Sequence, residues 1–366
     1  MKLTLATRAL GTAAVAAVAL TACGSNNNGS SGQATTAGST SGTGSCATGS
    51  LSGQGSTFQQ NIEKQWISQF QGQCSGAQIT YTGTGSGAGI QQFGSGTIDY
   101  AGSDAVMKPD EQTAANKRCN GTAIHLPVTA GGIAVIYNLK GVNNLKLSAP
   151  TVAGIFNGSI KTWNDPKIAA DNSGVTLPST AIKTFHRADG SGTTKVFTGY
   201  LAADAPSVWK LGSDKTINWP GGQAAKGSDG VVAGVKQTDG GVTYAEVSFA
   251  KANNLPTAQV KGVAGDYSSI SSATVSQAIA SGFSVTGTGN DVSGKLDYTK
   301  MTGYPISTVS YVILCEKGSN ANKAKLLKSF LTYDITTGQQ VADQLGFAPL
   351  PQSLVSKDQA ALANVS

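Results

Sequence analysis

The feature that most constrains the fold is a repeated order in which a short apolar run ends in a glycine-rich turn and an amphipathic helix follows. Residues 51–54 run into the turn Gly-Ser-Thr-Phe, and residues 78–82 run into Gly-Thr-Gly-Ser-Gly-Ala-Gly. The helix expected after the first turn has one apolar face, formed by Phe58, Ile62, Trp66 and Phe70. A second helix-like segment covers residues 90–93. This order predicts an α/β architecture with a parallel sheet.

The same pattern continues along the chain and is interrupted by two longer extended runs. Further strands are expected at residues 98–104, 182–186 and 241–245. The long runs, at residues 126–138 and 304–314, are interpreted as crossovers between two α/β lobes. Residues 322–345 carry apolar side chains at helical spacing. A length of 366 residues allows such a two-lobed body.

The N-terminus has the features of an exported protein. A basic start precedes an apolar segment that is too short for an ordinary membrane-spanning helix and ends in Leu-Thr-Ala-Cys. This tetrad resembles the bacterial lipobox, which implies a signal peptide at residues 1–22 and acylation of Cys23. The alternative is an ordinary secretory signal with a chance cysteine. We expect residues 23–45 to be the lipidated cysteine and a flexible tether that holds the folded part outside the cell membrane.

Composition excludes one class of partner and supports export. Charged residues make up 13% of the chain, against about 25% in a typical protein, and the net charge of +6 includes no run of Lys or Arg, so nucleic-acid binding is not expected. A mild positive field favours small anions. Four cysteines follow the tether, namely Cys46, Cys74, Cys119 and Cys315. An even number suggests two disulfides with three possible pairings, and the lack of a C-x-x-C motif gives no support to a metal site.

Four short turns share one chemistry, because each places glycine beside a hydroxyl or acidic group. They are Gly55-Ser-Thr-Phe58, Gly85-Ser-Gly87, Gly102-Ser-Asp104 and Arg187-Ala-Asp-Gly-Ser-Gly-Thr193. Two of them open helices, where unpaired N–H groups and the helix dipole suit a phosphate-like anion. The arginine adds a planar fork for oxyanions. Each turn alone is better explained as a helix cap or a tight turn; the four together with the arginine favour an anion site.

Enzyme motifs are mostly absent, and no catalytic residue is expected. The chain has no P-loop, no G-x-S-x-G and no H-E-x-x-H sequence. His125 lies in a strand-like run and is expected to be structural. His186 alternates to the opposite side of an extended segment from Arg187, so it is not expected to act as a base. A Ser-His-Asp arrangement of His186, Ser191 and Asp104 is the enzymatic alternative.

Seven stretches, in this order, resemble the phosphate-binding protein of bacterial ABC phosphate importers. They are GSTF, YTGTGSGAG, DYAGSDA, FNGSIKTWNDPKIA, HRADGSGTTKVFTGYL, INWPGGQAAKGSDGVVAGVKQTDGGVTYAE and YPISTVSYVIL. The resemblance spans about residues 51–355 and implies a class II periplasmic-binding-protein (Venus flytrap) fold, in which two α/β lobes joined by hinge crossover strands hold the ligand between them. We expect lobe 1 at residues 46–133 and 309–366 and lobe 2 at residues 134–308.

The resemblance also implies a set of phosphate-binding residues. This set is Thr57, Phe58, Ser86, Asp104, Arg187, Asp189, Ser191, Gly192 and Thr193. Hydroxyls and the N–H groups of Phe58 and Gly192 act as donors, and Arg187 forks onto the anion while Asp189 holds it. The sequence departs from the usual pattern at Ser56, where the family commonly has Ala, and at His186, where a second Arg is frequent; neither is a contact position.

Asp104 is the unusual member of the set, because an acid that faces an anion would normally repel it. The arrangement suits an anion that carries a proton, as phosphate does near neutral pH and sulfate does not. A polar group left unpaired in a closed cleft costs about 1–3 kcal/mol, and more if it is charged, so Asp104 would reject sulfate.

In the implied mechanism, the lobes close on phosphate by a hinge motion, and an ABC permease in the membrane takes the ligand. No cofactor, metal or catalysis is required. Two alternatives are kept: a secreted phosphoester hydrolase with the same anion cage, and a binding protein for another tetrahedral oxyanion such as sulfate.

This fold ranks the possible disulfides. Cys46 and Cys74 each lie five residues before a residue of the first and second expected strands, so the two cysteines would meet if these strands were parallel neighbours. Cys119 precedes the first long run and Cys315 ends the second, so antiparallel neighbours would bring this pair together. We therefore predict Cys46–Cys74 and Cys119–Cys315.

Overall fold

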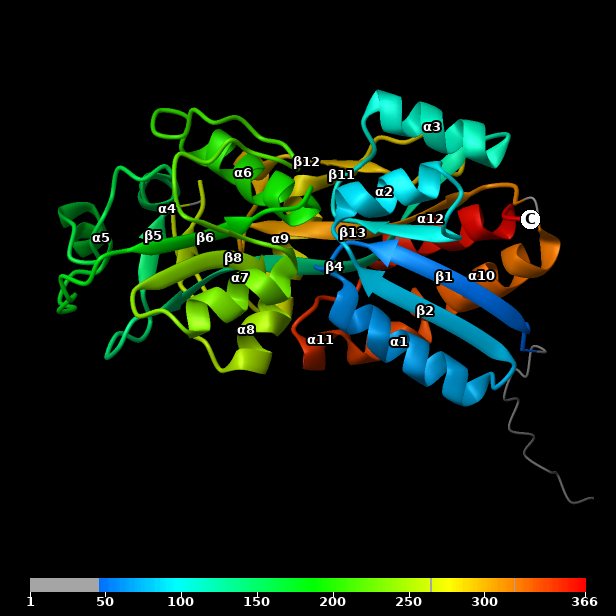
Figure 1. The fold of residues 1–366 in the computed structure, drawn as a ribbon, viewed down its shortest axis with the longest axis horizontal. Coiled ribbons are helices and arrows are strands. Elements are labelled where there is room, and N and C mark those ends of the chain that lie inside the picture. Colours follow the sequence, from blue (N-terminus) through cyan, green and yellow to red (C-terminus); the bar gives the residue numbers. More distant parts are fainter. Residues whose placement is uncertain (1–45, 264, 319) are drawn as a thin grey trace, which may run out of the picture. The chain divides into compact units, whose positions relative to one another are not determined.

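The computed structural model describes residues 46–263, 265–318 and 320–366 (Figure 1). The expected signal peptide at residues 1–22, the lipidation site Cys23 and the tether lie outside the described residues. Within the described part of the chain, no helix is both long enough and apolar enough to cross a lipid bilayer.

An eight-stranded sheet forms the centre of the body that residues 46–366 build. Its spatial order is β2 (Ala77–Gly83), β1 (Gly49–Gly55), β3 (Tyr100–Ser103), β13 (Ser307–Cys315), β4 (Ala123–Asn138), β8 (Gly241–Glu246), β6 (Lys183–Arg187) and β7 (Gln223–Ala225). Every residue of β13 and all but the last residue of β4 are buried, so these two strands pass through the core.

The sheet contains two groups of parallel strands. The first strand group is β2, β1 and β3, and the second strand group is β8, β6 and β7. Between them, β3–β13, β13–β4 and β4–β8 are antiparallel pairs. The prediction of a parallel sheet is therefore right within each group and wrong at the centre, because the two long crossover strands run in opposite directions there.

Helices α1 (Gln60–Gln73) and α2 (Ser86–Gly94) connect the strands of the first group. The chain steps from β1 outward to β2 through α1, and from β2 back past β1 to β3 through α2. Right-handed crossovers in opposite directions place their helices on opposite faces of a sheet, and Figure 1 shows α1 and α2 on opposite sides of β1. The second group is served by α6 (Gly192–Asp204), which follows β6, and α7 (Gly227–Lys236), which leads into β8.

Smaller elements surround these layers. The helices are α3 (Pro109–Cys119), α4 (Ala149–Phe156), α5 (Pro166–Asp171), α8 (Val247–Asn253), α9 (Ser272–Gly282), α10 (Ala321–Asp334), α11 (Ala342–Leu345) and α12 (Gln352–Ala363), with short 3-10 turns at Tyr298–Lys300 and Thr337–Val341. A three-stranded sheet contains β10 (Tyr267–Ser268), β9 (Gln259–Lys261) and β5 (Lys146–Ser148). A two-stranded sheet contains β11 (Phe283–Val285) and β12 (Gly294–Leu296).

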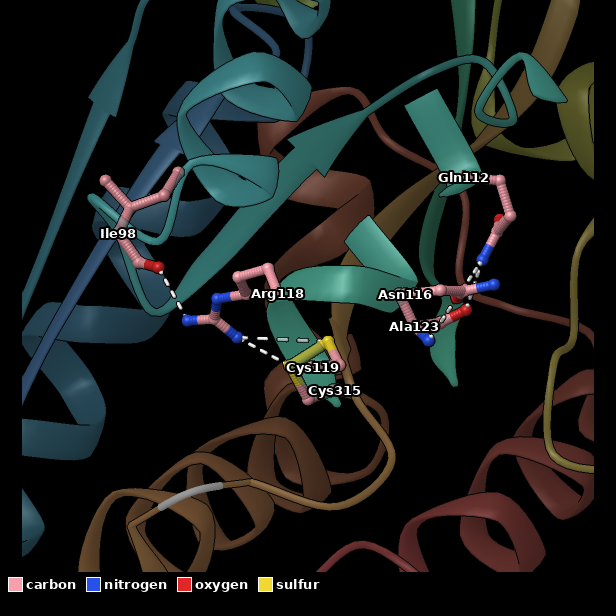
Figure 2. Close-up of a disulfide and its surroundings, with 7 residues drawn as sticks. All are labelled: Ile98, Gln112, Asn116, Arg118, Cys119, Ala123 and Cys315. Atoms are coloured by element: carbon pink, nitrogen blue, oxygen red, sulfur yellow. Dashed lines mark hydrogen bonds between the residues drawn. A yellow bond between two sulfur atoms is a disulfide. The ribbon is translucent and has the colours of Figure 1, made fainter. Parts of the chain in front are cut away.

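Both predicted disulfides are confirmed. Cys46 and Cys74 are bonded just ahead of β1 and β2, which pair in parallel from their first residues onward. Cys119 and Cys315 are bonded because Cys315, the last residue of β13, lies opposite the first residue of β4, Ala123. Figure 2 shows this second disulfide with Arg118, which donates from Nη2 to the carbonyl oxygen of Ile98 at 2.9 Å.

The helical spacing at residues 322–345 predicts more helix than the structure contains. Helix α10 ends at Asp334, and a 3-10 turn precedes the short α11. The chain turns there so that the buried Trp66 donates its indole N–H to the carbonyl oxygen of Gly338 at 2.8 Å. A Cβ added at Gly338 would lie 2.8 Å from the same indole nitrogen, so the close approach requires glycine.

Candidate functional site

The four turns singled out by the sequence meet at the carboxyl ends of the parallel strands. Residues 56–58 follow β1, residues 84–86 follow β2, Asp104 follows β3, and residues 188–191 follow β6. This is the edge at which open α/β sheets bind ligands. The turns of the two strand groups touch directly, because the N–H of Gly87 donates to the carbonyl oxygen of Gly190 at 2.8 Å.

Asp104 lies at the centre of these contacts and is 3% exposed. Its Oδ1 accepts from the hydroxyl of Ser56 at 2.5 Å, and its Oδ2 accepts from the hydroxyl of Thr193 at 3.0 Å. The hydroxyl of Ser310 lies 2.8 Å from Oδ1. A carboxylate oxygen has two acceptor positions, so Oδ1 accepts from Ser56 with its second position facing Ser310, and Oδ2 keeps one position for a further donor beside Thr193.

Burial raises the pKa of Asp104 above its ordinary value. The hydroxyl donors Ser56, Ser310 and Thr193, and the positive charge of Arg187, act in the opposite direction. These donors stabilise the ionised form of a carboxyl that would otherwise be neutralised by its buried position.

Arg187 ends β6 and is buried, with its side chain 2% exposed. Its Nε donates to Oδ1 of Asp189 at 2.8 Å and its Nη2 donates to Oδ2 at 2.5 Å, so Asp189 fixes the plane of the guanidinium. Although burial raises the pKa of Asp189, the hydrogen bonds and charge of Arg187 outweigh it and lower that pKa overall. The remaining nitrogen, Nη1, is buried and has no hydrogen-bond partner among the described residues.

Two helices begin at this point. Ser191 caps α6, since its hydroxyl accepts from the N–H of Thr194 at 3.1 Å, while α2 begins at Ser86 after Gly85. The first N–H groups of a helix have no partner within the helix. Gly85 has φ +93°, and a Cβ added there would lie 2.1 Å from Oδ2 of Asp189, so this turn requires glycine.

The structure places Thr57 and Phe58 slightly apart from this centre. The hydroxyl of Thr57 lies 2.9 Å from that of Ser228, the second residue of α7, and accepts from the Ser228 N–H at 3.2 Å. The N–H of Phe58 donates to the Ser56 hydroxyl at 3.0 Å. Ser86 and Thr193 both contact Asp104, because the Asp104 N–H donates to the Ser86 hydroxyl at 3.4 Å and the Thr193 hydroxyl donates to Oδ2 of Asp104 at 3.0 Å. Gly192 packs tightly here, since a Cβ added to it would lie 2.6 Å from the Ser86 hydroxyl.

Hereafter the cage denotes six residues around Oδ2 of Asp104, which keeps one acceptor position, and Nη1 of Arg187, which has no partner among the described residues. They are Ser86, Asp104, Arg187, Ser191, Gly192 and Thr193. The sequence did not single out Ser310 and Ser228, which lie beside the cage or its Thr57 extension. A hydroxyl inside the apolar strand β13 is the one signal that points to Ser310. The register of β13 against β4 shifts directly after Ser310, between Ser310 and Tyr311. Tyr311 lies opposite Pro127, which has no N–H for the ladder.

The two histidines have structural surroundings. His125 is 2% exposed; its Nδ1 lies 3.0 Å from Oδ1 of Asp291, and its Nε2 accepts from the N–H of Met107 at 3.0 Å. The ring of His186 stacks on Trp219 with centroids 5.1 Å apart. Among the described residues, neither ring is hydrogen-bonded to Ser191. In the part of the chain that the structure describes, no three His, Cys, Asp or Glu side chains are close enough to hold a metal ion.

Ion pairs and amide contacts join the two strand groups around the cage. Lys215, which is buried, pairs with Glu111 of α3 at 2.5 Å, and Lys108 pairs with Asp214 at 2.7 Å. On the other side, the Gln60 amide donates to Asp229 at 3.2 Å. These contacts join α3 and α1 to segments that flank the second strand group.

Comparison with known proteins connects this geometry to a family. A model of the PBP superfamily domain matches residues 30–336. The phosphate-binding protein PstS 3 of Mycobacterium leprae is 40% identical over 313 residues, which cover 84% of this chain and 85% of its own length. The phosphate-binding protein PstS of Xylella fastidiosa is 32% identical over 320 residues, which cover 85% and 84%.

Solved structures agree with these relatives at the level of the fold. A phosphate-binding protein from Stenotrophomonas maltophilia aligns with a TM-score of 0.69 at 20% identity, over 85% of this chain and 93% of its own. A periplasmic phosphate-binding protein, PfluDING, aligns with a TM-score of 0.68 at 22% identity over the same shares. The predicted α/β fold of two lobes joined by crossover strands is confirmed, and β4 and β13 lie between the two strand groups of the central sheet.

Proposed function

Because the chain belongs to the PstS family of phosphate-binding proteins within the PBP superfamily, we propose that it binds inorganic phosphate between its two lobes and delivers it to an ABC permease for import. The protein acts by capture and release and performs no catalysis. Neither a metal nor a cofactor takes part.

One observation carries this proposal: the same cage holds a buried guanidinium nitrogen that has no partner among the described residues and a buried carboxylate oxygen with one unused position. The nitrogen of Arg187 requires an acceptor, and the oxygen of Asp104 requires a donor. A hydrogen phosphate supplies both, since it has several acceptor oxygens and one O–H. Sulfate near neutral pH supplies acceptors only and would leave the Asp104 oxygen facing a lone pair.

The predicted ligand set is proposed in full, with its roles divided by position. Ser86, Ser191, Gly192 and Thr193 donate hydroxyl or N–H groups from the two helix starts, and Asp189 holds Arg187 in place. Thr57 and Phe58 contact phosphate by exchanging their present partners, Ser228 and Ser56, for the ligand. The same proposal covers the lobe boundaries, with residues 46–133 and 309–366 in lobe 1 and residues 134–308 in lobe 2.

We place the protein outside the cytoplasm, anchored to the cell membrane through acylated Cys23. The support is the lipobox-like tetrad and the two disulfides of the folded part, which persist in oxidising compartments. Metabolic labelling with a fatty-acid analogue tests this assignment. Label on the wild-type protein and none on Cys23→Ser is the expected result; label on neither protein contradicts the anchor.

The test of binding is calorimetric titration of the full chain, refolded to remove bound ligand, with phosphate and then with sulfate. We expect tight phosphate binding and negligible sulfate binding. Arg187→Gln removes the donor Nη1 and a buried positive charge. A hydrogen bond to a charged group is worth about 1.5–3 kcal/mol, and phosphate would lose more than one. We therefore expect phosphate affinity to fall at least about 100-fold. Arg118→Gln, which changes the half-buried arginine at the Cys119–Cys315 disulfide, is the matched control and should bind phosphate normally.

Two other results would redirect the assignment. Turnover of a chromogenic phosphate monoester that is lost in Arg187→Gln would support the phosphoester hydrolase. Sulfate binding as tight as phosphate binding would contradict the role given to Asp104 and support a general oxyanion receptor.

A further inference from the structure

The hydroxyl of Ser310 has one hydrogen and faces more than one acceptor. Its Oγ lies 2.6 Å from Oε1 of Gln59 and 2.8 Å from Oδ1 of Asp104. All three side chains are completely or almost completely buried, so water does not satisfy the acceptor that is left over. Whether Ser310 donates its hydrogen to Asp104 therefore depends on whether the oxygen or the nitrogen of the Gln59 amide faces that hydroxyl.

Gln59 in turn faces a buried acid on the helix that it precedes. Its second amide atom, assigned as Nε2, lies 3.3 Å from Oε2 of Glu63, and Oε1 of Glu63 accepts from the Tyr100 hydroxyl at 2.8 Å. Glu63 is 0% exposed, although a glutamate in the first turn of a helix is ordinarily solvated. A continuous line of hydrogen-bonding groups thus runs from Glu63 through Gln59 and Ser310 to Asp104.

A half-turn of the Gln59 amide exchanges the positions of its oxygen and its nitrogen. The hydrogen bonds along this line can therefore be donated in either of two directions. When Glu63 is ionised, Nε2 of Gln59 donates to it, Oε1 accepts the Ser310 hydrogen, and Asp104 loses that donor. When Glu63 is protonated, it donates to Oε1 of the turned amide, Nε2 donates to Ser310, and Ser310 donates to Asp104. In the second direction Oδ1 of Asp104 accepts from both Ser56 and Ser310, whereas in the first it keeps only the Ser56 hydroxyl.

The groups around Glu63 favour the protonated form. Burial raises the pKa of Glu63 to about 7, against the hydrogen bonds from Tyr100 and Gln59. Asp334 of α10 is also fully buried, and burial together with the negative charge of Glu63 raises its pKa well above the usual value. The remaining titratable neighbour is Tyr81 of β2, whose pKa is raised well above the usual value by burial and by the charges of Glu63 and Asp104. No cation faces Glu63 from these elements in the described residues.

Resting on the proposed function, we propose that Glu63, Gln59 and Ser310 form a proton-dependent relay. When Glu63 is protonated, the relay supplies Asp104 with its third hydroxyl donor and so raises the affinity of the cage for hydrogen phosphate. Glu63 and Gln59 are positioning residues, since neither touches the ligand. The donor from Ser310 holds Asp104 in its ionised, accepting form, which the ligand O–H requires. Phosphate binding is therefore coupled to protonation of Glu63. At a pH where Glu63 is ionised in the phosphate-free protein, the protein takes up a proton from the buffer when it binds phosphate.

The test compares phosphate affinity over pH 6–9 for the wild-type full chain and two variants. Glu63→Gln places a permanent amide donor where the protonated carboxyl acts, and Gln59→Met removes the group that passes the change to Ser310. The two variants alter different members of the relay, so a folding defect in one leaves the other informative. Asp358→Asn, which removes another buried carboxyl that lacks a link to Asp104, is the matched control.

The ligand titrates equally in every measurement, so its own pH dependence cancels in the ratio of wild-type to variant Kd. We expect this ratio to be flat near pH 6 for both relay variants and to rise at higher pH, approaching tenfold per pH unit because one proton is linked to binding. Titrations in two buffers of different ionisation enthalpy should show up to one more proton taken up by the wild type than by Glu63→Gln. The Asp358→Asn ratio should stay constant.

Ratios that are independent of pH for both relay variants, with phosphate bound by all proteins, would overturn the relay and leave the phosphate assignment intact. Absence of phosphate binding by the folded wild type would instead overturn the proposed function on which the relay rests.

Discussion

Replacement of Asp104 by asparagine isolates the chemical basis of anion selection. Oδ1 of the asparagine still accepts from Ser56 and Ser310, so the cage keeps its shape. The change falls on the other atom, where the Oδ2 that accepts from Thr193 becomes an NH2 donor. Thr193 adjusts by rotating its hydroxyl to accept. The ligand then meets a donor at the place where it met an acceptor.

The expected magnitude follows from the hydrogen bond that changes sign. In the wild type, sulfate leaves the second acceptor position of the buried, charged Oδ2 without a donor, which costs about 1.5–3 kcal/mol. Removing this penalty should tighten sulfate binding by about 10- to 150-fold. Phosphate loses its O–H···O bond and regains a bond from the amide, so its affinity should change by less than about tenfold.

Calorimetric titration with both anions at pH 7 measures this change. The exposed Asp229, whose Oδ2 accepts from the Gln60 amide outside the cage, provides the control as Asp229→Asn, and its phosphate-to-sulfate selectivity should equal that of the wild type. A selectivity of Asp104→Asn within threefold of the wild-type value would refute the reasoning, since rejection of sulfate would then have another source.

Three further perturbations test other parts of the structure. Gly192→Ala places a Cβ 2.6 Å from the Ser86 hydroxyl and 2.8 Å from the backbone nitrogen of Asp104, so phosphate affinity should fall more than tenfold and the urea midpoint should fall as well. Joint replacement of Cys119 and Cys315 by alanine removes a cross-link between residues 196 positions apart. It should lower the free energy of unfolding by about 2–5 kcal/mol in urea titrations. Burial raises the pKa of Asp358 to about 9, so the folded protein retains a proton that the unfolded chain releases, and the stability contributed by this group falls as the pH rises from about 4 to about 9. Asp358→Asn should therefore be more stable than the wild type at pH 8, with an advantage that shrinks by about 1.4 kcal/mol per pH unit on acidification; an equal advantage at pH 5 and pH 8 would contradict this.

The parts of the fold and site that the sequence predicts are those with local signatures. The apolar face of α1, the glycine turns after β1 and β2, and the cap at Ser191 are all encoded within a few residues. Both disulfides could be predicted because cysteines lie just before or at the ends of strands whose neighbours were correctly expected. The antiparallel centre of the sheet follows from long-range pairing of β4 and β13, which local patterns do not specify.

The residues behind the cage illustrate what local patterns miss. Glu63 has the sequence position of a solvated helix residue, and its burial results from packing against β3 and α10. Ser310 lies 251 positions from Gln59 and 206 from Asp104, so only the assembled sheet brings them together. The helix end at Asp334 was missed for a similar reason, because the turn accommodates an indole from a distant helix.

The glycines in and beside the cage, Gly87, Gly190 and Gly192, also bear on how the ligand range of this protein could evolve or be redesigned. Binding sites usually change their ligand by trimming or enlarging side chains, but much of this wall is main chain. Gly87 and Gly190 meet through a backbone hydrogen bond, and Gly192 lies against the backbone of Asp104. A larger anion finds no side chain there to displace, and every substitution of these glycines reduces the space further. Adaptation to a bulkier phosphorus compound would have to begin with the angle between the lobes, through residues far from the anion.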